Sequence, residues 1–221
     1  MCGRGVINDT MTWAQVHAFH RGDRQTPEHP IHASYNIAPT DPVPVVCARE
    51  STVAHWGLVP GASFPTFNAR SETAHEKPTF REAFRERRCV VALSGYYEWS
   101  APKQPHYIRR ADDAPLLLAG LWSVANETPT GFACTVLTCT PNQTLAKLHQ
   151  RMPCVLEPEE VASWLGPAPV EAHRVLLKAT PEGVLDHHRV SKRVGNVSAD
   201  DPSLIEPVAP EPPGLFGSLN L

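Results

Sequence analysis

Long hydrophobic runs are missing from this 221-residue sequence. No stretch approaches the ~20 consecutive apolar residues that a membrane-spanning helix needs, and the first ten residues hold no apolar segment of the secretory kind. We therefore expect a cytoplasmic protein that contacts no membrane. Hydrophobic residues make up 42% of the chain and charged residues 19%, a balance that predicts a folded core rather than disorder.

Patterns of metal-binding and disulfide-bonded cysteines are also missing. The six cysteines form no CxxC pair, and the eleven histidines complete no recognisable zinc spacing. A disulfide framework is not expected in a chain of this length without a secretory segment. We expect no metal or organic cofactor. Most of the cysteines are expected to be buried thiols that pack as small hydrophobic side chains, whereas Cys2 stands apart because it lies at the chain end.

The net charge of −3 is small, so it excludes no class of partner by itself. Its distribution is uneven, because residues 1–154 hold 15 Lys and Arg against 13 Asp and Glu, whereas residues 155–221 hold 5 against 10. An anionic ligand is therefore expected on the first two thirds of the chain.

Proline is abundant, with 23 residues spread along the chain, and this predicts many short elements joined by turns. Capping boxes beginning at Thr79 and Thr140 predict two helix starts, and residues 35–40 are expected to form a loop. We predict one compact α+β domain over residues 1–200, with a mainly antiparallel, barrel-like β core and several short helices, and a Pro-rich irregular tail over residues 201–221. The expected strands are 43–47, 52–59, 89–93, 95–99, 106–110, 116–122, 133–139 and 184–190, and the expected helices are 10–21, 79–88, 140–149, 158–165 and 170–178.

Cys2 carries the chemistry that distinguishes this sequence. Removal of the initiator methionine would leave a free α-amine and a thiol on adjacent carbons, with ordinary pKa values of about 7.7–8.0 and about 8.5. Such an aminothiol condenses with an aldehyde to an imine, and the thiolate then closes a five-membered thiazolidine in an intramolecular step. The amine can also activate the thiol as a nucleophile. The alternative is a frayed chain end without a role.

Six short motifs follow one another in fixed order, and together they resemble the SOS response-associated peptidase (SRAP) family of abasic-site-processing proteins over roughly residues 2–200. The motifs are CGR (2–4), YNIAPT (35–40), WGLVP (56–60), NARSET (68–73), GYYEW (95–99) and LHQRMP (148–153). The resemblance implies a compact α+β fold around a barrel-like β core. It also implies a sensor, expected to be a monomer, that captures abasic sites in single-stranded DNA as a thiazolidine crosslink on Cys2, through lyase-like Schiff-base chemistry.

The resemblance also implies four catalytic residues. Cys2 is the nucleophile, and Asn68 orients it and the sugar by hydrogen bonding. Glu98, between aromatic neighbours, is the general acid and base for ring opening and imine formation. His149 is the second proton carrier, or a contact for the phosphate 3′ of the lesion. The plainer interpretations are a turn asparagine for Asn68 and a solvated strand carboxylate for Glu98.

Seven further residues are expected to contact or shape the DNA site. The guanidinium groups suit phosphate oxygens, and the tryptophans suit stacking on splayed bases, although core packing is an equal alternative for Trp56. Two positions depart from the family pattern: Gly5, where an aromatic residue is usual, and Gln150, where Asp is common. The expected DNA-binding residues are Arg4, Asn36, Pro39, Trp56, Arg70, Trp99 and Arg151.

Three other functions use the same residues. The first is a cysteine peptidase, able to remove its own initiator methionine, with Cys2 as nucleophile, His149 as base and Glu98 or Asn68 in support. The second is a non-catalytic module that binds single-stranded DNA, for which Cys2 is dispensable. The third is a metal-binding regulator, which the absent ligand spacing disfavours.

Overall fold

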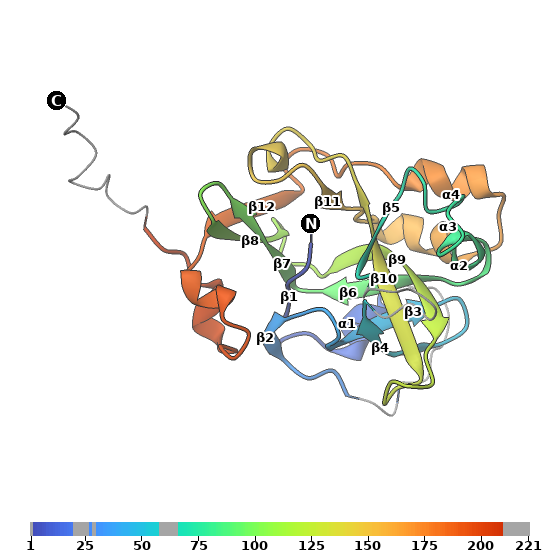
Figure 1. Ribbon diagram of the computed structural model, residues 1–221, viewed down its shortest axis with the longest axis horizontal. Helices are drawn as coiled ribbons and strands as arrows, with labels where there is room; N and C mark the ends of the chain where they lie inside the picture. Colours follow the sequence, from blue (N-terminus) through green and yellow to red (C-terminus); the bar gives the residue numbers. More distant parts are fainter. Residues whose placement is uncertain (1, 20–26, 28–29, 58–65, 210–221) are drawn as a thin grey trace.

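Figure 1 shows the computed structural model, which describes residues 2–19, 27, 30–57 and 66–209. Two sheets pack together, with short helices around them. This arrangement confirms the predicted α+β class with a barrel-like, largely antiparallel β core and short helices.

Five strands close into a barrel. They are β3 (Pro42–Cys47), β4 (Ser51–Trp56), β6 (Arg88–Leu93), β9 (Leu116–Val124) and β10 (Phe132–Cys139). The order is β10-β4-β3-β6-β9, and β9 pairs with β10 to complete the ring. Only the β4–β10 pairing within this ring is parallel. Closure leaves these strands without a free edge, which is one way a small sheet satisfies its backbone groups.

Strand β10 also carries two very short strands beyond the barrel. The strand β5 (Asn68–Arg70) pairs with it in parallel, and β11 (Met152–Pro153) pairs with it in antiparallel fashion. Neither was predicted, because two or three residues carry too little pattern to mark a strand and are held by the partner instead.

The second sheet has the order β12-β8-β7-β1-β2, and every pairing in it is antiparallel. It contains β1 (Gly5–Ile7), β2 (Ser34–Ile37), β7 (Gly95–Ser100), β8 (Gln104–Arg110) and β12 (Leu185–Arg189). The chain passes from the barrel strand β6 into β7 through a single residue, Ser94. The two sheets are therefore linked covalently at the point where the chain changes sheet.

The helices are short, as the proline content predicted. The α-helices are α1 (Trp13–His17), α2 (Arg81–Glu86), α3 (Val161–Leu165) and α4 (Val170–Leu176). The 3₁₀ turns are η1 (Leu145–Lys147), η2 (Pro158–Glu160), η3 (Lys192–Gly195) and η4 (Pro202–Ile205).

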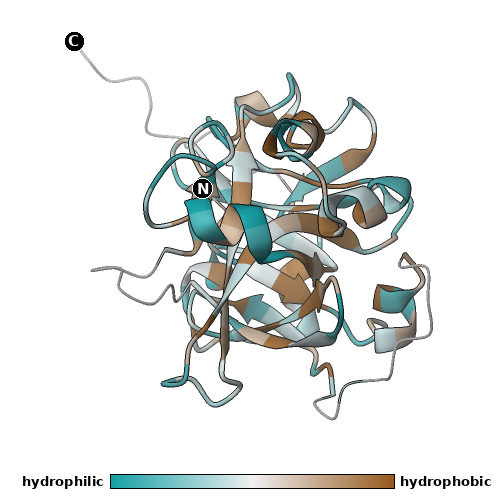
Figure 2. Ribbon diagram, turned by 90° about the vertical axis from the view of Figure 1, so that its right-hand side faces the viewer, coloured by the Kyte–Doolittle hydropathy of each residue, from teal (hydrophilic) through white to brown (hydrophobic). Residues whose placement is uncertain are grey.

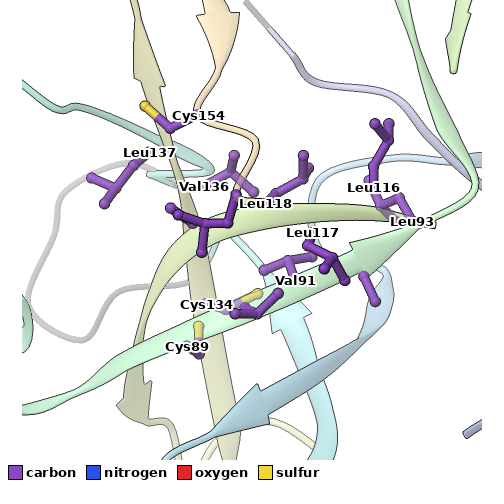
Figure 3. Close-up of a cluster of buried hydrophobic side chains, with 14 of the residues drawn as sticks. Cys89, Val91, Leu93, Leu116, Leu117, Leu118, Cys134, Val136, Leu137 and Cys154 are labelled. Atoms are coloured by element: carbon purple, nitrogen blue, oxygen red, sulfur yellow. The ribbon is translucent and has the colours of Figure 1, made fainter. Parts of the chain in front are cut away.

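The barrel interior and the space between the sheets are apolar. Val91, Leu118 and Val136 are fully buried, and Figure 3 shows side chains of β6, β9 and β10 gathered in one cluster with three cysteine thiols. Figure 2 shows the same contrast over the whole fold, with brown strand segments inside and teal segments outside. All six cysteines are buried free thiols, including Cys2, which we had expected to differ from the rest.

Several helices and strands begin or end at other residues than the sequence predicted. The first half of the predicted loop at 35–40 belongs to strand β2, and β1 was not predicted. Helix α1 begins at a capping box of Thr12 and Gln15 rather than at residue 10. The expected box at Thr79 does not form, because the N-cap of α2 is Phe80 without a side-chain bond. The helix predicted over 140–149 is only the turn η1, and Asn142 Oδ1 caps it by accepting from Leu145 N at 2.9 Å.

Two sequence predictions fall partly outside the described residues. These are the end of the 10–21 helix and the last two residues of the 52–59 strand. At the other end of the chain, η4 begins at Asp201 as N-cap and buries Leu204 completely. The first residues of the predicted tail are thus folded, while residues 210–221 lie outside the described residues, so the boundary between domain and tail stays a prediction.

Candidate active site

The pairing of β1 with β7 places the chain start beside Glu98. Gly5 lies opposite Tyr96, and Tyr97 N donates to Arg4 O at 2.9 Å. Cys2 lies three residues before Gly5, so this pairing holds the chain start near β7, the strand that carries Glu98. The electrostatic influence of Glu98 on the Cys2 thiol agrees with this placement.

Asn68 holds Cys2 from the opposite side. Its Nδ2 donates to the Cys2 carbonyl oxygen at 2.7 Å. The Oδ1 atom of Asn68 is buried and has no hydrogen-bond partner among the described residues. Asn68 begins β5, whose register with Val136 of β10 fixes where this amide lies. This hydrogen bond is consistent with the predicted role of Asn68 in orienting Cys2.

The side chains of Glu98 and His149 also lie close together. Glu98 Oε2 lies 3.9 Å from His149 Nδ1, and the Glu98 side chain is 7% exposed against 31% for His149. The backbone N–H of Arg151 donates to His149 Nδ1 at 3.1 Å. The same Nδ1 lies 3.3 Å from Arg151 O, so the tautomer decides whether Nδ1 accepts from the N–H or donates to the carbonyl of Arg151. The structure thus brings all four predicted catalytic residues together from four separate segments of the chain.

The environment of Cys2 opposes ionisation of its thiol. Cys2 is 1% exposed, and burial raises its thiol pKa well above the ordinary value, with the Glu98 carboxylate adding to the rise. The thiol is therefore protonated at neutral pH and needs a base before it can act as a nucleophile. Glu98 and His149 are the neighbouring groups that can supply one.

Tyr96 completes the interior wall of the site, and the sequence analysis gave it no catalytic role. It is 1% exposed, and burial is the main cause that raises its pKa well above the ordinary value, followed by Cys2, Glu98 and Cys139. Its phenol is therefore neutral, and the groups that shift it are those of the cluster. Its position directly before Tyr97 and Glu98 in the GYYEW motif was the signal for it.

Arg4 and Asn36 are tied to each other rather than directed at a ligand. The Arg4 guanidinium donates to Asn36 Oδ1 at 2.7 Å and to Val194 O at 2.9 Å. Asn36 Nδ2 donates in turn to the carbonyls of Asn196 and Ala199, and Asn36 is 4% exposed. Both residues therefore fasten the C-terminal segment to the start of β1 and to β2, and the phosphate role of Arg4 stays a prediction.

The tryptophans divide between core and surface. Trp56 is fully buried and its Nε1 donates to Phe67 O at 2.9 Å, so it presents no ring face to a base. The stacking role is corrected to the core-packing alternative. Trp99 is half-buried against the second, smaller cluster of buried residues, and its stacking role stays a prediction. Pro39 is half-buried in the turn after β2.

Arg151 and Arg70 differ in how they are partnered. Arg151 forms a bidentate pair with Glu72, at 2.7 and 2.8 Å, and donates to Thr138 O. The Arg151 hydrogen bonds hold the pKa of Glu72 below its usual range. Arg70 is exposed and lies on the same face of β5 as Asn68, with no hydrogen bond or ion pair in the described part of the chain. Sequence reasoning missed Glu72, although it stands inside the NARSET motif.

The two departures from the family pattern leave the cluster intact. A Cβ at Gly5 would lie 3.0 Å from Leu93 Cδ1 and 3.7 Å from the Trp56 ring, so neighbouring side chains fill the space behind the chain start. Gln150 is exposed. Gly95 is a stricter requirement, because a Cβ there would lie 2.3 Å from the Tyr107 ring.

Two absences concern the described residues alone. No helix among them is long and apolar enough to cross a membrane. Within the same residues, no group of three or more His, Cys, Asp or Glu side chains is arranged to hold a metal ion.

Comparison with known proteins gives the cluster its context. The family model for SOS response associated peptidase (SRAP) matches residues 1–197. The chain belongs to the SRAP family. It is 30% identical over 203 residues to the abasic site processing protein YoqW of Bacillus subtilis, covering 83% of this chain and 90% of that one. It is also 30% identical over 224 residues to YedK of Escherichia coli, covering 94% and 100%, which carries the same descriptive name.

Solved structures show the same fold. A Bacteroides thetaiotaomicron protein superposes with a TM-score of 0.79 at 24% identity, covering 94% of this chain and all of that one. A phage-related protein of Bordetella bronchiseptica gives a TM-score of 0.68 at 27% identity, covering 86% of this chain and 95% of that one. This SRAP-family chain therefore shares its fold with solved structures along nearly its whole length.

Proposed function

We propose that this SRAP protein captures abasic sites in single-stranded DNA by forming a covalent thiazolidine crosslink through Cys2. The observation that carries the proposal is the hydrogen bond from Asn68 to the Cys2 carbonyl at 2.7 Å, and the charge of Glu98, which acts on the Cys2 thiol, supports it. The names of the relatives in Bacillus subtilis and Escherichia coli support a role in processing abasic sites. All four side chains of the cluster come from one chain, so a monomer suffices.

The reaction begins with two proton transfers. An abasic deoxyribose is mostly a closed hemiacetal, and ring opening needs a proton on the ring oxygen while the C1′ hydroxyl loses one. Glu98 and His149, 3.9 Å apart, form a pair that can exchange these protons. The Cys2 α-amine, free once Met1 has been removed, then attacks the C1′ aldehyde. Loss of one water gives the imine.

Ring closure uses the thiol of the same residue. The thiol sulfur adds to C1′ of the imine, and its proton passes to the imine nitrogen through the neighbouring base. The product is a thiazolidine, and the balance of the whole sequence is aldehyde plus aminothiol giving thiazolidine plus water. The raised pKa of Cys2 makes this deprotonation a step that needs help, which is a reason for a carboxylate at this position.

A denaturing gel tests the proposal. Met-processed protein is mixed with a single-stranded oligonucleotide carrying one abasic site, beside an undamaged oligonucleotide and the Cys2→Ala variant. A slow band that needs both the abasic site and Cys2, and that forms without borohydride, is expected. Failure of protein with a verified free N-terminal cysteine to form this band would refute the crosslinking function.

A second experiment, with peptide substrates, separates the peptidase alternative. A peptidase releases many product molecules per protein molecule, whereas a crosslinking protein stops after one reaction. Incubation with a peptide library and counting of products by mass spectrometry therefore distinguishes the two. Repeated turnover that depends on Cys2 and His149, without any DNA adduct, would favour the peptidase.

A further inference from the structure

Strand register continues the candidate site across the second sheet. Glu98 of β7 lies opposite His106 of β8, and His106 lies opposite Arg189 of β12. Residues directly opposite in antiparallel strands point to the same face. Glu98, His106 and Arg189 therefore form a row on the face of the sheet that carries the site. His187, two residues before Arg189 in β12, lies on the same face.

Exposure increases along this row. Glu98 and His106 are 5% and 7% exposed, whereas His187 is half-buried and Arg189 is exposed at the sheet edge. Burial is the main cause that lowers the pKa of His106 to about 4, and His187 and Arg189 add to it, so the His106 ring is neutral at pH 7. The two histidine rings meet edge to face with centroids 5.3 Å apart. The charged group that solvent and ligands can reach on this row is therefore Arg189.

A second cation approaches the same edge from η1. Lys147 is exposed in η1, and the residues just before η1, Gln143 and Thr144, are hydrogen-bonded to Glu182, three residues before β12. Neither Lys147 nor Arg189 has an ion-pair partner within 4 Å among the described residues. Asp186 belongs to the opposite face, where it lies 4.0 Å from Arg109. Glu182 also faces η1, where its carboxylate accepts from Gln143 N, Thr144 N and Thr144 Oγ1 and interacts electrostatically with Lys147 without a salt bridge between them.

These cations contrast with the arginines of the matched motifs. Arg4 is bound by Asn36 and Val194 O, and Arg151 is bound by Glu72. Arg70 is the motif arginine that has no such partner, and it lies on β5. In Figure 1, β5 and β12 lie on opposite sides of the N-terminus. Unpaired positive charge therefore flanks the candidate site on both sides.

We propose that Lys147 and Arg189 form a phosphate-binding edge that holds the DNA backbone on one flank of the lesion. The inference rests on the proposed function, since the occupant is the single strand whose abasic sugar lies at Cys2. Charge complementarity and the continuous row from Glu98 to Arg189 carry it. Neither residue was among the DNA-binding residues expected from the sequence.

A binding measurement tests the edge without requiring the crosslink. In a Cys2→Ala background, the double variant K147A/R189A is titrated with a fluorescent, undamaged 15-nucleotide single strand over a range of salt concentrations. Arg49 and Lys77 are exposed cations on the β3–β4 turn and just before α2, so R49A/K77A is the matched control with the same loss of charge. Thermal melts establish that both variants are folded.

The expected result is affinity about tenfold lower for K147A/R189A at low salt. The slope of log affinity against log salt should fall in magnitude by about 1.4, because each lost contact to single-stranded DNA contributes about 0.7. The control should change neither quantity appreciably. Equal losses in both variants, or no loss in K147A/R189A, would overturn the proposal.

Crosslinking on one-flank substrates gives an independent test. Oligonucleotides carrying the abasic site at the 5′ or the 3′ end offer the protein only one flank each. The K147A/R189A defect should be confined to one of the two substrates, whereas equal defects on both would contradict a single-flank site. If wild-type protein crosslinks neither these substrates nor an oligonucleotide with an internal abasic site, the proposed function fails, and the binding titration still decides whether the edge exists.

Discussion

Replacement of Asn68 by alanine is the most direct probe of how Cys2 is held. The substitution removes the Nδ2 donor that binds the Cys2 carbonyl at 2.7 Å, and Cys2 itself is 1% exposed. A buried acceptor left without its partner costs about 1–3 kcal/mol. Since the amine and thiol of Cys2 are placed through this contact, we expect the same energy to raise the barrier to crosslinking.

That energy corresponds to a crosslinking rate about 5- to 140-fold lower, because 1.4 kcal/mol is a factor of ten. The assay is single-turnover crosslinking to a single-stranded abasic oligonucleotide with protein in excess. Asn68→Asp should be at least as slow, because it places an acceptor against the Cys2 carbonyl and a second carboxylate near Glu98. Binding of undamaged single strand should be unchanged, since positioning and not affinity is lost.

Asn8→Ala is the matched control. Its side chain accepts hydrogen bonds from Ser94 Oγ and Thr10 Oγ1, both at 3.0 Å, just beyond the other end of β1. It therefore removes bonds of similar chemistry without touching Cys2. A crosslinking rate for Asn68→Ala within twofold of wild type, or a loss no greater than that of Asn8→Ala, would refute the positioning argument.

Three further predictions follow from the charges and pKa shifts. Glu72→Gln removes the anion that holds Arg151. If Arg151 contacts phosphate, a fluorescence titration should show about two- to fivefold stronger binding of single-stranded DNA. Unchanged binding would mean that Arg151 has a structural role. The unfolding free energy in urea should fall between pH 7.5 and 9.5, because unfolded thiols ionise above about pH 8.5 while burial raises the pKa of folded Cys89 and Cys134. This loss is about 1.4 kcal/mol per thiol at pH 9.5, and Cys134→Ala should reduce it by one such step. The free energy of unfolding should also fall as the pH drops from 6.5 to 4, because the unfolded His106 binds a proton near pH 6.5 while the folded pKa is about 4. This loss is up to about 3 kcal/mol, and it should be absent in His106→Gln.

The long apolar strands were predictable because their pattern is local. The segments 89–93, 116–122 and 133–139 lie within strands β6, β9 and β10, where continuous apolar runs match strands buried in the barrel. The strands β1, β5 and β11 have two or three residues each, and their existence depends on the partner strand. No local pattern of residues encodes that dependence.

The candidate site divides in the same way. The motifs selected Cys2, Asn68, Glu98 and His149, and the structure brings these four together. Motif membership alone, however, does not say where a side chain points, so Arg4, Asn36 and Trp56 were given ligand contacts although all three have intramolecular partners. His106 could have been found from the sequence, because a short turn after Ser100 places it opposite Glu98.

Geometry at the site depends on how the two sheets are joined. Strand β7 carries Glu98 and, through β1, the Cys2 segment, whereas β10 carries Asn68 through β5. These supports belong to different sheets, and the chain between the sheets turns at Ser94. There Ser94 N donates to Val6 O at 2.8 Å, and Ser94 Oγ bonds to Asn8 at 3.0 Å.

The packing behind β1 also affects the position of Cys2. Gly5 approaches Leu93 of the barrel so closely that an added Cβ would lie 3.0 Å from it. A side chain at Gly5 requires either Leu93 or β1 to shift, and a shift of β1 would move Cys2 relative to Asn68. Catalytic geometry can therefore be lost through residues that never touch DNA, because a shift of about 1 Å between reacting groups is enough to slow a reaction by about 100-fold. The core of this protein is thus part of the machinery that positions Cys2.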